Sequence, residues 1–126
     1  MKKIICTDNA PAPIGPYSQA VMFGNTLYTS GQVALNPATM ELVTEDIEKE
    51  TQQVMENLKA VLTAAELTFE NVVKTSIFIT DMNNFSRINS VYAKYFDEAT
   101  APARETVQVS VLPRNVNIEI SMIAMK

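Results

Sequence analysis

The chain has 126 residues, 47% of them hydrophobic and 19% charged, which is typical of one globular domain covering residues 1–126. Histidine is absent and Cys6 is the only cysteine, which excludes internal disulfides, histidine-based catalysis and almost every usual zinc or iron site. The net charge is −4 and the Lys and Arg residues are scattered, so we expect no binding to nucleic acid. No apolar run is long enough to cross a bilayer, and Asp8 with a proline cluster follows the basic start where a signal peptide would have its apolar core. We therefore expect a cytoplasmic protein that makes no contact with a membrane.

The first half of the chain predicts a hairpin followed by a long helix. Residues 8–16 contain three prolines and predict an irregular segment. Two apolar runs, Ala20–Phe23 and Thr26–Val33, flank Gly24-Asn25, a dipeptide that tolerates the positive φ of a tight hairpin turn. A helix is predicted over residues 44–66, with Thr44 or Glu45 near its start. Its apolar side chains recur at steps of three or four: Ile47, Thr51, Val54, Leu58, Val61, Leu62 and Ala65.

The second half predicts a strand, a shorter helix and a final hairpin. Val72–Thr80 is β-branched and aromatic, as strands are. A helix is predicted over about 83–97, with an apolar face and capping residues before it. Thr106–Leu112 and Val116–Met125 alternate in polarity and are joined by Pro113-Arg114-Asn115, which predicts a β-hairpin.

These elements together predict an α+β fold. Two strands, a helix, a strand, a helix and two strands follow in that order, with a short extra strand at residues 3–6. We expect one sheet with both helices packed on one face. The other face should carry many polar but neutral groups, which need water or another subunit.

Arg104 stands where a loop, Ala101-Pro102-Ala103, enters a strand. Its guanidinium is suited to holding a carboxylate by two parallel hydrogen bonds. The alternative is an ordinary surface pair with Glu105 or Glu98, and spacing alone favours this alternative because surface ion pairs are common.

Glu119 lies inside the last predicted strand, between two isoleucines. It is either a partly desolvated carboxylate suited to proton transfer or a solvated residue of the polar sheet face, and the sequence alone favours neither. In the predicted hairpin, Glu119 pairs near Val109, about five residues or roughly 17 Å from Arg104 along the strand. If the two side chains act on one small ligand, we expect them to come from different subunits.

Other polar positions have both structural and functional interpretations. Tyr17 closes a ligand pocket or packs its proline-rich loop, and Gly31, after Ser30, permits a close approach to the backbone or marks a bulge. Asn89 interrupts an apolar helix face, so we expect its amide to find a partner and read it as structural support more readily than as a catalyst. Cys6 is interpreted as an inert thiol, because no general base is evident for it.

Several segments, in order along nearly the whole chain, resemble the RidA (YjgF) family. They are Ala10-Pro11-Ala12-Pro13-Ile14-Gly15-Pro16-Tyr17-Ser18-Gln19, Ser30-Gly31-Gln32, Asn57-Leu58-Lys59-Ala60-Val61-Leu62, Val73-Lys74-Thr75, Phe78-Ile79-Thr80-Asp81-Met82, Asn89-x-x-Tyr92-x-x-Tyr95-Phe96, Pro102-Ala103-Arg104, Leu112-Pro113 and Ile118-Glu119-Ile120. The resemblance implies a chorismate-mutase-like α+β fold, and a homotrimer with a central β-barrel and three clefts between subunits.

The resemblance also implies a cofactor-free and metal-free reaction. It is the hydrolysis of 2-imino or enamine acids such as 2-iminobutanoate and 2-iminopropanoate, the reactive products of pyridoxal-phosphate enzymes, to 2-keto acids and ammonia. Arg104 would bind the substrate carboxylate, with backbone groups at Gly31 and Thr106 helping to hold the ligand. Tyr17 and Glu119 would line the pocket, Glu119 serving the water or proton transfers. Ser30 and Asn89 match positions at or beside it.

The chain departs from the family pattern at a few positions. Glu105-Thr106 replaces the Ser-Cys that often follows the arginine, and Glu105 would compete with substrate if it folded back onto Arg104. Met40 and Glu66 replace glycines common in the family's turns, which should affect local geometry more than function. Two other functions are consistent with the same fold: a keto-acid-binding regulator without catalysis, and, least favoured by the acidic charge, an endoribonuclease or translation inhibitor.

Overall fold

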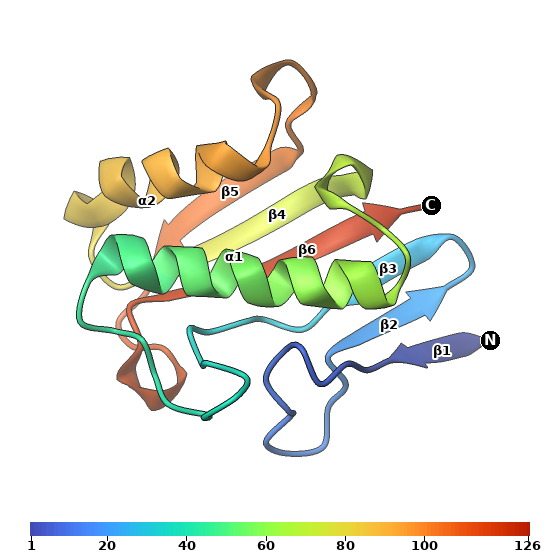
Figure 1. Cartoon of the computed structure of the whole chain (residues 1–126). Helices are drawn as coiled ribbons and strands as arrows, with labels where there is room; N and C mark the ends of the chain where they lie inside the picture. Colours follow the sequence, from blue (N-terminus) through green and yellow to red (C-terminus); the bar gives the residue numbers. More distant parts are fainter.

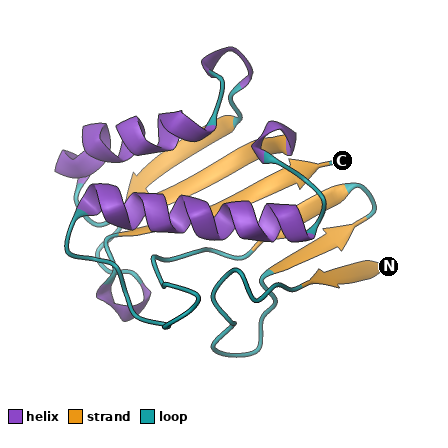
Figure 2. Cartoon of the chain, in the orientation of Figure 1, coloured by secondary structure: helices purple, strands orange, loops and turns teal.

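The computed structural model describes all residues, 1–126, and confirms an α+β fold with one mixed sheet and two helices (Figure 1). The sheet has six strands in the order β1-β2-β3-β6-β4-β5, and every neighbouring pair is antiparallel except β4 and β5. Both helices lie on the same face of the sheet (Figure 2). The elements are β1 (Lys2–Ile5), β2 (Ala20–Phe23), β3 (Thr26–Thr29), α1 (Ile47–Ala64), β4 (Val72–Ile79), α2 (Phe85–Tyr92), β5 (Ala103–Gln108) and β6 (Ile118–Met125).

The core lies between the sheet and the two helices, and α1 supplies most of its helical residues. The apolar stripe of this helix is fully buried at Val54, Leu58 and Leu62, and it packs with buried isoleucines of β4 and β6 in one continuous cluster. The helix begins at Ile47, later than predicted, because the Asp46 side chain accepts a hydrogen bond from the Lys49 amide and caps it. The second helix is also shorter than predicted, since α2 is flanked by single 3₁₀ turns on both sides.

The predicted C-terminal hairpin is wrong. Strand β6 lies in the middle of the sheet, between β3 and β4, whereas β5 forms an edge and runs parallel to β4. Ile118, Ile120, Met122 and Ala124 are all at most 2% exposed, so β6 has a completely buried face that a central position satisfies. In contrast, β5 contains no buried residue. Alternating polarity alone could not reveal which strand each of the two would pair with.

The sheet face opposite the helices is more apolar than predicted. Ile4, Phe23, Tyr28, Val107 and Met125 all lie on it, each between 42% and 58% exposed. In β2, β3 and β6 these positions alternate with side chains that point toward the helices. An exposed apolar face of this kind is typical of an interaction surface.

Two turns bear out a prediction about local geometry. Met40 and Glu66 have φ values of 60° and 61°, in the left-handed region that favours glycine. The Gly24-Asn25 turn and the strand near residues 3–6 are also present as predicted, although β3 ends at Thr29 and not at Val33.

Neither helix has the length and apolar character that spanning a bilayer would require.

Candidate functional site

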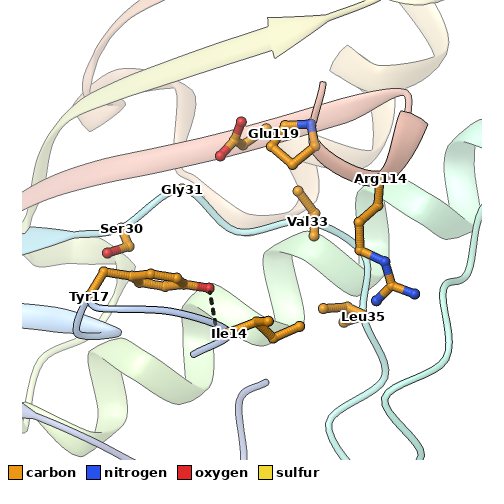
Figure 3. A pocket seen from close by; sticks show the side chains of 9 residues that line it. Ile14, Tyr17, Ser30, Gly31, Val33, Leu35, Arg114 and Glu119 are labelled. Carbon is orange, nitrogen blue, oxygen red and sulfur yellow. Dashed lines mark hydrogen bonds between the residues drawn. The ribbon is translucent and has the colours of Figure 1, made fainter. Parts of the chain in front are cut away.

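The predicted site residues fall into two separate groups, each beside its own cavity. The first cavity has a volume of about 450 Å³ and contains Tyr17, Ser30, Gly31 and Glu119 (Figure 3). Its remaining walls are Ile14, Val33, Leu35, Pro113 and Arg114. We refer to it as the Glu119 pocket.

Glu119 projects from β6 on the face opposite the helices, because its neighbours Ile118 and Ile120 point into the core. Its side chain packs directly over Gly31: a Cβ added to that glycine would lie 2.1 Å from Glu119 Oε2 and 2.7 Å from Cδ. The absence of a side chain at Gly31 therefore allows the carboxylate to occupy this position. Burial raises the pKa of Glu119 above its usual range, and no cation within ion-pair distance offsets this effect.

Tyr17 and Ser30 organise the loop that borders this pocket. The Tyr17 hydroxyl accepts a hydrogen bond from the Ile14 amide at 3.3 Å, and Ser30 Oγ donates to the Ser18 carbonyl at 2.5 Å. The Tyr17 side chain remains half-exposed beside the cavity. Both residues thus hold the loop in place and still present polar atoms at the edge of the Glu119 pocket.

Arg104 lies at the second cavity, which has a volume of about 680 Å³ and is bordered by Asn89, Tyr92 and Pro102 among others. We refer to it as the Arg104 pocket. The guanidinium donates from Nη1 to Asn89 Oδ1 at 2.7 Å, and its Cζ lies 5.6 Å and 5.0 Å from the ring centroids of Phe85 and Tyr92. Helix α2 therefore orients the guanidinium through one hydrogen bond and two cation–π contacts.

The interpretation of Arg104 as half of a surface ion pair is wrong. The three ion pairs of the structure are Lys74–Glu105 and those of Arg87 with Asp46 and Glu48. Glu105 lies on the other face of β5, where it pairs with Lys74 at 3.0 Å and accepts a hydrogen bond from the Ser76 hydroxyl. These contacts, the Ser76 hydrogen bond first, lower the pKa of Glu105, and they keep its charge away from Arg104.

Thr106 follows Arg104 by two residues on the same face of β5. Its Oγ1 is buried and makes no hydrogen bond within the chain. Buried hydroxyls without a partner are rare in proteins, and such a group beside an arginine without an ion pair is consistent with a ligand contact. The resemblance to the RidA (YjgF) family implied a ligand contact only through the Thr106 backbone.

The two pockets cannot share one small ligand within a chain. Glu119 of β6 pairs with Phe78 of β4, and Phe78 pairs with Val107 of β5. Arg104 therefore lies two strand spacings across the sheet from Glu119 and three residues along the strand, which places their Cα atoms about 14 Å apart. Their side chains also point to opposite faces of the sheet. The separation predicted from a hairpin thus holds for a different reason, since β4 lies between the two strands.

Two residues that shape the Glu119 pocket were not singled out from the sequence. Arg114, treated there only as a turn residue, lines the Glu119 pocket. Glu50 of α1 is fully buried and accepts hydrogen bonds from the backbone and side-chain amides of Asn117, both at 2.8 Å, which fixes the segment between Arg114 and Glu119. The position of Glu50 among Ile47, Thr51 and Val54 on the buried stripe was the available signal, because an acid there needs a partner.

Comparison with known proteins identifies the family. The family model described as endoribonuclease L-PSP matches residues 7–126. The chain belongs to this family, also called YjgF/RidA/RutC. It is 51% identical over 126 residues to a RutC family protein of Pyrococcus horikoshii, covering 100% of this chain and 99% of the relative.

Other members of the YjgF/RidA/RutC family carry different functional names. The chain is 46% identical over 128 residues to the 2-iminobutanoate/2-iminopropanoate deaminase of Escherichia coli, covering 100% of this chain and 99% of the relative. The structure of a Thermotoga maritima protein called a putative endoribonuclease matches with a TM-score of 0.97 at 51% identity, over 100% of this chain and 98% of the other. E. coli TdcF with bound serine matches with a TM-score of 0.92 at 44% identity, over 98% of both chains.

Proposed function

We propose that this protein hydrolyses 2-imino acids, including 2-iminobutanoate and 2-iminopropanoate, to 2-keto acids and ammonia. The reaction takes place in the cytoplasm, at clefts between the subunits of a homotrimer, and needs neither metal nor cofactor. It removes the reactive imines and enamines that pyridoxal-phosphate enzymes release. Each cleft combines the Glu119 pocket of one subunit with Arg104 of the next.

The observation that carries this proposal is an oriented guanidinium without a carboxylate partner. Arg104 is held by Asn89, Phe85 and Tyr92 but makes no ion pair, so four of its five N–H donors remain for an anion. The E. coli relative named as an imine deaminase, and the serine bound to TdcF, support an amino-acid-sized ligand with a carboxylate.

The separation of the two pockets supports a site shared between copies. Arg104 and Glu119 lie on opposite faces of one sheet, and the face that carries Glu119 also exposes the apolar side chains of Phe23, Tyr28 and Met125. In the proposed assembly a second copy covers this face, and its edge strand β5 lies close enough to the Glu119 pocket for its Arg104 and Thr106 to reach the ligand.

The chemistry required of these residues is modest. Arg104 binds the substrate carboxylate, and Tyr17 and Ser30 border the space beside it. Glu119 accepts a proton from water as the water oxygen bonds to the imino carbon. The proton then passes to nitrogen, which gives a carbinolamine. The hydroxyl proton of the carbinolamine is transferred to nitrogen by the same carboxylate, the carbon–nitrogen bond breaks as the carbonyl forms, and ammonia leaves a 2-keto acid. The raised pKa of Glu119 suits a group that both accepts and returns a proton near neutral pH.

Mixing two inactive variants tests the shared site. Arg104→Ala and Glu119→Gln should each lose most 2-iminobutanoate hydrolysis, and refolding them together should restore activity. In randomly mixed cyclic trimers, about one quarter of the clefts receive an intact Glu119 and an intact Arg104. Recovery near one quarter of wild-type activity supports the proposal. A site within one chain would give no recovery, and near-normal activity of Arg104→Ala alone would refute the anchor role.

Two alternatives make different predictions in the same assays. A keto-acid-binding regulator would bind 2-oxobutanoate without accelerating loss of the imine. The name of the family model and that of the Thermotoga structure favour RNA cleavage as a second candidate. Cleavage of RNA that survives extensive purification and disappears in Arg104→Ala would support that candidate.

A further inference from the structure

The Glu119 pocket is larger than a small imino acid requires. Three of its polar side chains, those of Tyr17, Ser30 and Glu119, lie toward one side (Figure 3). Beyond them the walls are the apolar side chains of Ile14, Val33 and Leu35. A cavity volume of about 450 Å³ falls in the range of about 300–1,000 Å³ that accommodates drug-sized ligands. The pocket therefore has room for a substrate with an extended side chain.

A second arginine stands at the far side of this space. Figure 3 shows the Arg114 guanidinium beside Leu35, across the pocket from Ser30 and Tyr17. Arg114 and Glu119 are the only charged residues that line the cavity. Arg114 forms no ion pair, with Glu119 or with any other acid, and its side chain makes no hydrogen bond within the protein.

The backbone holds Arg114 in a defined position. Arg114 and Asn115 have φ values of 58° and 57°, a left-handed conformation that non-glycine residues rarely adopt. The Asn115 amide donates to the Leu112 carbonyl at 3.0 Å, and Asn117 is anchored to the buried Glu50. Unusual backbone conformations persist where the surroundings enforce them and are frequent at ligand sites.

We infer that Arg114 gives the site a preference for 2-imino acids with an anionic side chain, the class formed when the amino group of an acidic amino acid is oxidised. The inference rests on the proposed function. Arg104 of a second copy binds the α-carboxylate and Glu119 faces the imino carbon. The side chain then extends along Ile14, Val33 and Leu35, and its carboxylate meets Arg114. The hydrolysis is unchanged: water adds to the imino carbon and nitrogen leaves as ammonia.

The test compares kcat/KM for 2-iminoglutarate and 2-iminobutanoate, both generated in the assay by an amino acid oxidase. We expect Arg114→Gln to lower the ratio of the two values about tenfold, as expected for loss of a hydrogen-bonded charge pair, and Arg114→Lys to restore part of it. Added salt should lower the wild-type ratio and leave that of Arg114→Gln nearly constant. Arg87→Gln changes the net charge equally, on helix α2, and should leave the ratio unchanged.

The outcomes separate this inference from the proposed function. If the wild type hydrolyses 2-iminobutanoate but Arg114→Gln leaves the ratio and its salt dependence unchanged, the role of Arg114 is wrong and the deaminase proposal stands. If the wild type hydrolyses neither imine, the proposed function fails. Calorimetric binding of 2-oxoglutarate and 2-oxobutanoate then still measures the preference, and equal loss of both ligands in Arg114→Gln overturns the inference.

Discussion

Replacing Gly31 by alanine tests whether the placement of Glu119 determines activity. The new Cβ would lie 2.1 Å from Oε2, and an ordinary contact begins at 3.4 Å, so the carboxylate oxygen has to move by at least about 1.3 Å. Displacing a catalytic group by about 1 Å can lower a rate about a hundredfold, and we expect a loss of this size in kcat/KM for 2-iminobutanoate. The half-buried side chain can swing into the cavity, so the free energy of unfolding should fall by less than about 1 kcal/mol.

Gly24→Ala is the matched control for this experiment. Gly24 has a φ of 61° but open space around the position of a Cβ, whereas Gly31 has no positive φ and meets Glu119. Gly24→Ala should therefore cost about 1–2 kcal/mol of stability, from backbone strain, and retain activity. Thermal unfolding and steady-state kinetics of both variants measure the two effects separately.

The double variant Gly31→Ala/Glu119→Gln decides whether the loss acts through Glu119. Two changes that affect the same group should not add, so the double variant should be about as active as Glu119→Gln alone. Wild-type activity in Gly31→Ala, or additive losses in the double variant, would refute the argument that this glycine serves to place the carboxylate.

Three further predictions concern neighbouring groups. Asn89→Ala removes the acceptor that orients Arg104 and should raise KM roughly fivefold with less effect on kcat, measured by steady-state kinetics. Tyr17→Phe removes the acceptor of the Ile14 amide and should lower kcat/KM severalfold, while the melting temperature changes by less than about 2 °C. Burial raises the pKa of Glu50, so its contribution to stability is lost as pH rises from about 4.5 through its folded-state pKa. Thermal unfolding across this range should show Glu50→Gln gaining stability relative to the wild type as pH rises.

Much of the fold was predictable because local patterns determine it. The stripe of α1, the alternation in β4 and β6 and the Gly24-Asn25 turn each report on a residue's immediate neighbours. Strand order is different. The polarity of β6 is the same whether its neighbour is β5 or β4, so nothing local to Ile118–Met125 indicates a central position.

The site was predictable to a similar degree. The sequence directed attention to Arg104 and Glu119, but whether Arg104 would pair with Glu105 depended on which side chains share a face of β5. The role of Gly31 in admitting Glu119 depends on an isolated bridge between Gln32 and Ile120, a contact between segments almost ninety residues apart. Arg114 was overlooked because its position depends on a left-handed backbone that the sequence Pro113-Arg114-Asn115 does not specify.

The central place of β6 has a consequence for synthesis of the protein on the ribosome. This strand is the last of the six to emerge, yet it supplies the hydrogen bonds that join β3 to β4. Until it arrives, the β1–β3 meander and β4 each present an unpaired inner edge, and the nascent chain cannot close its sheet. A fold that depends on such distant pairing forms slowly and exposes aggregation-prone edges meanwhile. Chains stalled before residue 118 should therefore be preferred clients of chaperones.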